Sequence, residues 1–192
     1  FTEPAGNKVK RITPNGVITE FLLPSGGGPE GITSDLDGNI WFTEVGGNKI
    51  GRITPEGAIR EFLIRTDSSY PFGITSGPDG NVWFVEYYTD KVGRITPEGV
   101  ITEFSIPTSN SNSISITDGP DGNIWFTEAS ANKIGRVNLV DLKDQGPPDR
   151  DLELLSPFNN GATWTVSQGY LNNRDQSKAG CHIGFGPDHC RN

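Results

Sequence analysis

Polar and apolar residues alternate along most of this chain, in short runs that turn-forming residues separate. Within residues 71–107, Lys91–Thr96 alternates at period two, and Val100–Ile106 alternates again after a Pro-Glu-Gly turn. Period-two alternation is the pattern of a β-strand with one buried face. Asn81–Glu86 is apolar, β-branched and aromatic, which predicts a strand buried on both faces. Together with Phe72–Ser76, the stretch predicts four short antiparallel strands.

This four-strand pattern repeats along the chain. A run of the form Asp-Gly-Asn-Ile/Val-Trp-Phe-Thr/Val-Glu ends at Glu44, Glu86 and Glu128, and the chain opens on Phe-Thr-Glu, which ends at Glu3. The phenylalanine of the run recurs every 41 or 42 residues. A period in this range with four strands per unit is typical of a β-propeller blade. The sequence therefore predicts an all-β, propeller-type array of about four four-stranded blades.

The predicted domain boundaries follow the repeat. Residues 1–157 are expected to form the array, with an incomplete first blade and three full ones, at 1–28, 29–70, 71–112 and 113–157. A charged, Pro- and Gly-rich connection interrupts the last blade, so its outer strand is expected late, within Asp151–Pro157. Residues 158–192 are expected to be a C-terminal tail or a truncated extra domain, with one strand at Thr163–Val166.

Charge and hydropathy exclude two classes of partner. The formal net charge of -8 argues against a nucleic-acid backbone, which requires a basic surface. No apolar run approaches the ~20 residues needed to cross a bilayer, so no membrane span is predicted. The first residue falls inside a repeat, and we therefore expect a processed precursor or a part of a longer gene product.

The repeat resembles that of the streptogramin B lyase (virginiamycin B lyase-like) family. The resemblance is carried by Gly-Pro-Asp-Gly-Asn-Ile-Trp-Phe-Thr-Glu, ending at Glu128, by Asn132–Arg136, and by Arg94–Gly99, and it covers roughly residues 1–137. It implies a seven-bladed propeller. For the lyases of the family it also implies opening of an antibiotic's ester ring by elimination, with Mg²⁺ and with His and Glu residues on one propeller face.

The resemblance implies a catalytic Glu followed two residues later by a His, directly after the Trp-Phe-Thr segment. The Glu position is matched by Glu3, Glu44, Glu86 and Glu128. The His position is occupied by Ala5, Gly46, Tyr88 and Ser130, none of which is a base near neutral pH. We therefore expect no lyase activity. Two roles stay open for the four glutamates: structural pairing with Lys or Arg, or binding of a ligand or of a cation such as Mg²⁺.

Residues 157–190 resemble the opening of an M23-type zinc metallopeptidase domain, through the run Trp164–Tyr170. The resemblance implies that His182 lies near a metal ligand and Asp188 near its partner. The later His-x-His that completes such a site is missing from the sequence. A catalytic zinc needs three protein ligands, so peptidase activity is not expected.

The two cysteines lie in the last dozen residues, within Cys181-His182 and His189-Cys190. A disulfide between Cys181 and Cys190 would close a short loop that contains Gly and Pro, and would indicate a secreted protein. The alternative is a metal site that uses His182, Asp188 and His189. Adjacent Cys and His residues fit one tetrahedral ion poorly, so the disulfide is the expected state.

These patterns lead to one main functional hypothesis and two alternatives. The main one is a secreted, non-catalytic module for structure, self-assembly or binding, with no cofactor. Its open blade edges would be completed by residues 163–168 of its own tail or of a neighbouring subunit, giving a closed oligomer or a filament. The alternatives are a lyase-like enzyme or ligand-binding propeller that uses the glutamates with Mg²⁺, and a targeting module of a truncated M23-type peptidase. The sequence does not identify the ligand.

Overall fold

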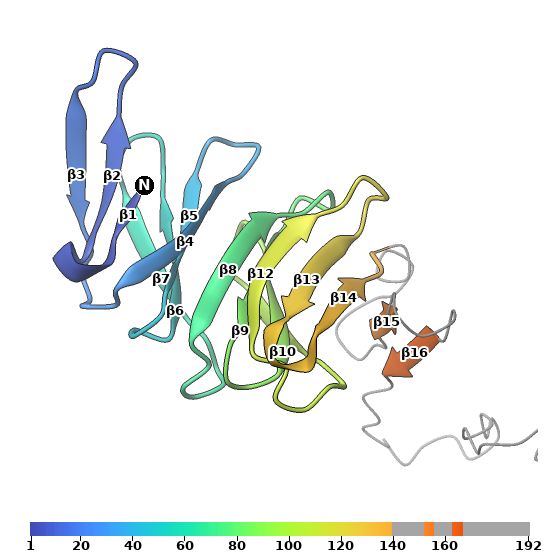
Figure 1. Cartoon of the computed structure of the whole chain (residues 1–192). Helices are drawn as coiled ribbons and strands as arrows, with labels where there is room; N and C mark the ends of the chain where they lie inside the picture. Colours follow the sequence, from blue (N-terminus) through green and yellow to red (C-terminus); the bar gives the residue numbers. More distant parts are fainter. Residues whose placement is uncertain (140–151, 156–162, 167–192) are drawn as a thin grey trace, which may run out of the picture.

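The computed structural model describes residues 1–139, 152–155 and 163–166, whose strands form four antiparallel sheets (Figure 1). The first blade contains β1 (Thr2–Glu3), β2 (Lys8–Ile12) and β3 (Ile18–Leu22). The second contains β4 (Pro29–Ser34), β5 (Ile40–Glu44), β6 (Lys49–Ile53) and β7 (Ile59–Leu63).

The other two sheets continue the array. The third blade contains β8 (Pro71–Ser76), β9 (Val82–Glu86), β10 (Lys91–Ile95) and β11 (Ile101–Ser105). The fourth contains β12 (Ser113–Asp118), β13 (Ile124–Glu128), β14 (Lys133–Val137), β15 (Leu152–Leu155) and β16 (Thr163–Val166). Two short 3₁₀ turns, η1 (Pro4–Gly6) and η2 (Ala129–Ala131), follow β1 and β13. The all-β, propeller-type array of about four blades is confirmed.

The last blade differs from the sequence prediction in one respect. Its delayed outer strand forms as expected, because β15 pairs with β14 through Val137 and Leu154. The tail strand β16 was expected to complete the first blade, and this expectation is wrong within this chain. Instead β16 pairs with β15, with Leu152 opposite Val166, so it extends the outer edge of the fourth blade.

The innermost strands β4, β8 and β12 lie side by side (Figure 1). Gly31 of β4 faces the backbone carbonyl of Phe72, and Gly73 of β8 faces that of Ile114, at distances that leave no room for a β-carbon. Glycine is therefore required where one inner strand approaches the backbone of the next.

The core lies between the blades rather than within them. One buried cluster joins Trp41, Ile50 and Ile64 of the second blade to residues of the third, namely Ile74, Val82, Phe84 and Ile95. Similar clusters join the first blade to the second and the third to the fourth. Because each interface combines apolar side chains of two sheets, a blade depends on its neighbours for most of its hydrophobic stabilisation.

The tryptophan of each repeat is held by a polar group of its own blade. Trp41 Nε1 donates a 2.7 Å hydrogen bond to Asp35, and the Arg52 guanidinium lies 5.3 Å from the Trp41 ring centroid. The third and fourth blades repeat both contacts, through Asp79, Trp83 and Arg94, and through Asp121, Trp125 and Arg136. Trp41 and Trp83 are fully buried, whereas Trp125 of the last blade is only half-buried.

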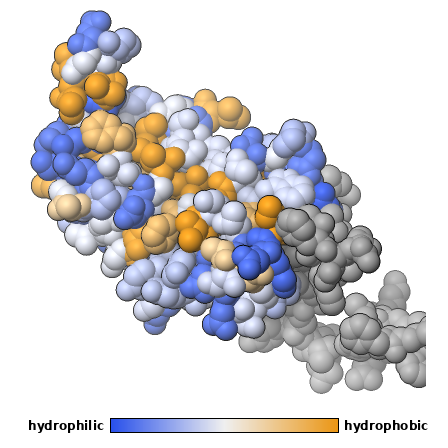
Figure 2. Space-filling view, in the orientation of Figure 1, coloured by the Kyte–Doolittle hydropathy of each residue, from blue (hydrophilic) through white to orange (hydrophobic). Residues whose placement is uncertain are grey.

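The first blade exposes apolar side chains on the β2–β3 hairpin, at the N-terminal end of the array (Figure 2). Val17 and Leu22 are 61% and 67% exposed, and Ile12 and Ile18 are exposed beside them. This surface has the apolar composition of the faces that pack together elsewhere in the array. Among the described residues, no helix has the length and apolar character needed to cross a membrane.

Replacing Trp83 by alanine tests the inter-blade packing. Because the ring is fully buried between two sheets, we expect Trp83→Ala to lower the free energy of unfolding by ~3–5 kcal/mol, as measured by denaturant titration. The matched control is Trp125→Ala, at the same repeat position in the last blade, for which we expect a smaller loss. Equal losses for the two variants would contradict the assignment.

Candidate functional site

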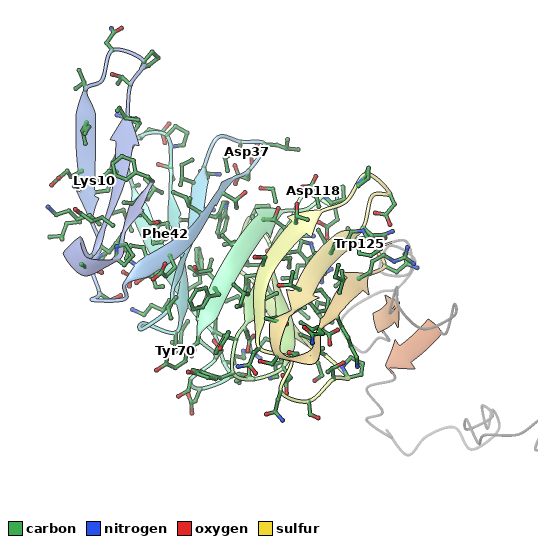
Figure 3. The ribbon with its side chains drawn as sticks, viewed as in Figure 1. Lys10, Asp37, Phe42, Tyr70, Asp118 and Trp125 are labelled. Carbon is green, nitrogen blue, oxygen red and sulfur yellow. The ribbon has the colours of Figure 1, made fainter. Side chains whose placement is uncertain are left out.

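One end of the array gathers loops from every blade. Here the turns between second and third strands meet the connections that lead into the next blade, at residues 23–28, 64–70 and 106–112. The two kinds of loop are hydrogen-bonded to each other, from Gly46 N to Gly27 O at 2.8 Å and from Tyr87 N to Tyr70 O at 3.1 Å. Figure 3 shows Tyr70 at this loop end, with Asp37 and Asp118 at the opposite end of the sheets.

Residues in the left-handed conformation fasten these loops. Asn48 has a φ of 55°, and its side-chain amide donates to the carbonyls of Ile64 and Thr66 while its oxygen accepts from Ser69 N at 2.8 Å. Asn7 holds residues 23–27 in the same way, and Asp90 holds residues 110–111. Asn and Asp tolerate the left-handed region and bond readily to nearby backbone. The loop end is therefore a fixed frame.

A pocket of about 450 Å³ opens at this end between the first two blades. Its lining residues are Pro4, Ala5, Asn7, Gly26, Gly27, Gly28, Glu30, Val45 and Gly46. The three consecutive glycines make a wall without side chains, and a β-carbon on Gly27 would collide with the carboxylate of Glu44. The wall therefore leaves space open above a buried acid.

Glu30 is the only ionisable side chain among these lining residues, and it is exposed. It is the second residue of the innermost strand β4. The same position is Phe72 in β8 and Ile114 in β12. Thr2 Oγ1 donates a 2.8 Å hydrogen bond to the Glu30 carbonyl, which fixes this part of β4 against the first blade. Glu30 was not among the residues singled out from the sequence, although the acid interrupts an otherwise apolar repeat position.

The four strand-end glutamates occupy a different environment. Glu44, Glu86 and Glu128 are 0%, 0% and 5% exposed, and one carboxylate oxygen of each has no hydrogen-bond partner among the described residues. Glu3 is partly exposed and forms a 2.9 Å ion pair with Lys10. No three of these carboxylates gather into one cluster within the described residues.

Pairing with Lys or Arg was one of the two roles left open for these glutamates, but the nearest lysines pair with other acids instead of Glu44 and Glu86. Lys49 pairs with Glu61 at 2.7 Å rather than with Glu44. Lys91 lies 3.5 Å from Glu103 rather than pairing with Glu86. Glu44 instead accepts a 3.0 Å hydrogen bond from Ser25 Oγ, and Glu86 accepts one from Thr89 Oγ1.

Burial raises the pKa of both carboxyls. The pKa of Glu44 rises to about 7, mainly through burial and further through the nearby negative charge of Glu61, while Ser25 and Lys49 oppose the rise. The pKa of Glu86 rises to about 8, mainly through burial, with Thr89 opposing the rise and Glu103 adding to it. Both side chains therefore retain a proton at a pH where an exposed glutamate has lost it.

The other residues singled out from the sequence are placed as follows. Ala5 and Gly46 line the pocket, Tyr88 is exposed on the β9–β10 turn, and Ser130 lies in η2. Both candidate states of the tail lie outside the described residues, the Cys181–Cys190 disulfide and the metal site of His182, Asp188 and His189.

The residues at the loop end do not fit the Mg²⁺ site that the family resemblance implies. No group of three His, Cys, Asp or Glu side chains converges within residues 1–139. The pocket offers one carboxylate, and the neighbouring Glu44 is shielded by the glycine wall and occupied by Ser25. The resemblance implies His as well as Glu residues around the ion, and residues 1–139 contain no His.

The raised pKa values predict a stability that falls with pH. Folded Glu44 and Glu86 keep their protons up to about pH 7 and 8, whereas the unfolded chain releases them near 4.5. Between these values the folded state binds more protons, so the free energy of unfolding decreases as pH rises, by at most ~1.4 kcal/mol per pH unit for each group. We expect Glu86→Gln to flatten this slope in denaturant titrations from pH 5 to 8.

The control for this measurement is Glu56→Gln, an exposed carboxyl in the β6–β7 turn. A hydrogen bond from Thr54 lowers the pKa of Glu56 below its ordinary value, so it titrates below the pH window and its replacement should leave the slope unchanged. An unchanged slope in Glu86→Gln would contradict the assignment of the titration to the buried acid.

A family model described as the Virginiamycin B lyase family matches residues 1–143. The chain is 44% identical to a catalytically inactive histidine-to-alanine variant of virginiamycin B lyase from Staphylococcus aureus with quinupristin, over 81% of this chain and 58% of that one, with a TM-score of 0.70. It is 37% identical to selenomethionine-substituted virginiamycin B lyase from the same organism (86% and 65% covered, TM-score 0.72). A streptogramin B lyase structure is 34% identical (85% and 56% covered, TM-score 0.72).

These similarities correct the main functional hypothesis. The expectation of a non-catalytic structural or self-assembling module is wrong, because the matched structures are those of lyases. Secretion stays a prediction. No curated protein matches the chain, and the chain spans between 56% and 65% of the length of the three lyase structures. Since the family model covers most of its residues, the chain belongs to the virginiamycin B lyase family.

Proposed function

We propose that this chain has a lyase-like function: it binds a streptogramin B-type cyclic ester in the pocket between its first two blades and opens the ring by elimination. One observation carries the proposal. The pocket at the loop end holds a single ionisable side chain, the exposed Glu30, in a chain 44% identical to a lyase whose structure contains quinupristin.

Glu30 is the group that we assign to proton transfer. In an elimination, a base removes a proton from the carbon next to the one that bears the ester oxygen. The electron pair of that C–H bond forms a carbon–carbon double bond, the carbon–oxygen bond breaks, and the ring opens with a carboxylate as the leaving group. The Glu30 carboxylate takes the proton and then releases it to solvent. It is suited to this role because a ligand in the pocket can touch it.

The buried Glu44 has a supporting role in this proposal. It is 0% exposed and lies beneath the glycine wall, so a bound ligand does not touch it in this arrangement. Through Ser25 Oγ it shares a hydrogen-bond network with Glu61, which accepts from Ser25 N at 3.0 Å. Glu44 is therefore a positioning residue for the loop that forms the pocket wall.

The rigidity of the pocket favours binding. Asn7 lines the pocket and also ties residues 23–27 to the first blade, through the carbonyls of Leu23 and Ser25 and the amide of Gly27. A preformed wall lowers the entropy lost when a ligand is ordered, and it holds the reacting bond at a defined place relative to the base.

Replacing Glu30 by glutamine tests the assigned base. We expect the wild type to convert quinupristin to a linear product and Glu30→Gln to do so about 10²–10⁴-fold more slowly, with binding retained. Liquid chromatography coupled to mass spectrometry reads the outcome, because the elimination product is an isomer of the substrate whereas hydrolysis adds the mass of one water. Equal rates in the two proteins would remove Glu30 from the mechanism, and no linear product from the wild type would remove the lyase function.

Filling the pocket tests the location of the site independently of the chemistry. Ala5 is exposed and lines the pocket, so we expect Ala5→Phe to weaken quinupristin binding in calorimetric titrations by roughly 10-fold or more, through steric exclusion. The matched control is Ala58→Phe, an exposed alanine in the β6–β7 turn at the opposite end. Equal affinities for the two variants would place the ligand elsewhere.

A further inference from the structure

Tyr70 has a backbone conformation for which the other blades use glycine or asparagine. Its φ is 52°, in the left-handed region. The residue directly before the innermost strand is Gly28 in the second blade, with φ 60°, and Asn112 in the fourth, with φ 45°. Glycine and asparagine suit this region, whereas a bulky aromatic residue there is an outlier. Strain of this kind gathers where function requires a particular side chain.

The Tyr70 side chain belongs to an exposed aromatic cluster, here called the aromatic rim and consisting of Tyr70, Tyr87 and Tyr88. The ring centroids of Tyr70 and Tyr88 are 4.7 Å apart at an interplanar angle of 79°, and those of Tyr87 and Tyr88 are 4.7 Å apart at 76°. Tyr70 is 40% and Tyr88 61% exposed. Edge-to-face contacts of this kind fix each ring relative to the next and leave ring faces open.

The aromatic rim is anchored to the core and to the loop frame. Tyr87 lies 5.9 Å from the ring of Phe72, which packs against the cluster between the third and fourth blades. The backbone amide of Tyr87 donates to the Tyr70 carbonyl. Ser69, next to Tyr70, is fully buried and donates to Asn48 from both its amide and its hydroxyl. Rings held in this way lose little entropy when a ligand covers them.

Tyr70 lies at the loop end of the array (Figure 3), and the glycine wall of the pocket belongs to the preceding connection at the same end. The pocket wall is the connection into β4, and Tyr70 ends the connection into β8, while β4 and β8 lie side by side. Packed sheets are about 10 Å apart. A cyclic peptide bound in the pocket is long enough to span this separation.

We propose that Tyr70 and Tyr88 determine specificity by stacking against an aromatic or planar group of the ligand bound in the pocket. The inference rests on the proposed function and adds the part of the ligand that is recognised. Packing within the fold does not require Tyr70, because the sister loops reach the same conformation with glycine or asparagine. Packing within the fold does not depend on Tyr88 either, since this side chain is mostly exposed.

The decisive variant is Tyr70→Asn, which installs the residue of the fourth blade. It relieves the left-handed strain, so we expect the melting temperature to rise by about 2 °C or more. It also removes the stacking ring, so we expect the affinity for quinupristin in calorimetric titrations to fall by roughly 5- to 10-fold. A purely structural tyrosine gives the opposite stability result, because its loss lowers the melting temperature.

Tyr88 supplies a matched pair of variants. Tyr88→Phe keeps the ring and should retain the affinity for quinupristin, whereas Tyr88→Ala should lose it to the same extent as Tyr70→Asn. The control is Leu36→Ala, which removes a 97% exposed apolar side chain from the β4–β5 turn at the opposite end, and which should leave affinity unchanged.

The possible outcomes separate the aromatic rim from the pocket. If the wild type binds quinupristin, Ala5→Phe weakens binding, and Tyr70→Asn and Tyr88→Ala do not, the rim proposal is overturned while the proposed function stands. A lower melting temperature in Tyr70→Asn with unchanged affinity makes the residue structural and also overturns the rim. No binding to the wild type overturns both proposals together.

Discussion

The structure depends on the contact between neighbouring blades. Each sheet buries its apolar face against the next one, and Trp41 and Phe84, which belong to different blades, share a single cluster. Hydrophobic burial of this kind is nearly proportional to area, so a blade without its neighbour loses most of its stabilisation. The close approach of the inner strands adds a steric condition, because Gly31 and Gly73 face the backbone of the following blade. Burial and steric fit together hold neighbouring blades in one arrangement.

The same contact determines the chemistry of the loop end. Glu44 and Glu86 close the second strand of each blade, where the sheets are packed, and burial there raises the pKa of each carboxyl to about 7 and 8. Their protonated form is compatible with an interior that offers one hydroxyl partner. Groups that a ligand can reach must instead lie where the loops separate, as Glu30 does beside the glycine wall.

The period of 41 or 42 residues and the alternation at period two were sufficient to predict the strands of the blades, because each blade satisfies the same packing condition. The environment of the strand-end glutamates was not predictable, since their burial results from a neighbouring loop that is distant in sequence, such as Gly27 above Glu44. The half-burial of Trp125 also depends on position in the array rather than on local sequence. The pairing of β16 was missed because alternation shows that a segment is a strand but not which edge it joins.

Because the blades repeat, each residue can be compared with the residues at the same position in the other blades, and a departure from them helps to locate function. Phe72 and Ile114 show what packing accepts at the second position of an innermost strand, and Glu30 departs from it beside a pocket. Gly28 and Asn112 show what the backbone accepts before that strand, and Tyr70 departs from it where rings remain exposed. Sister blades share the same repeat of strands and turns, so such departures point to what each residue presents to solvent. Both departures lie at the loop end rather than in the inter-blade core.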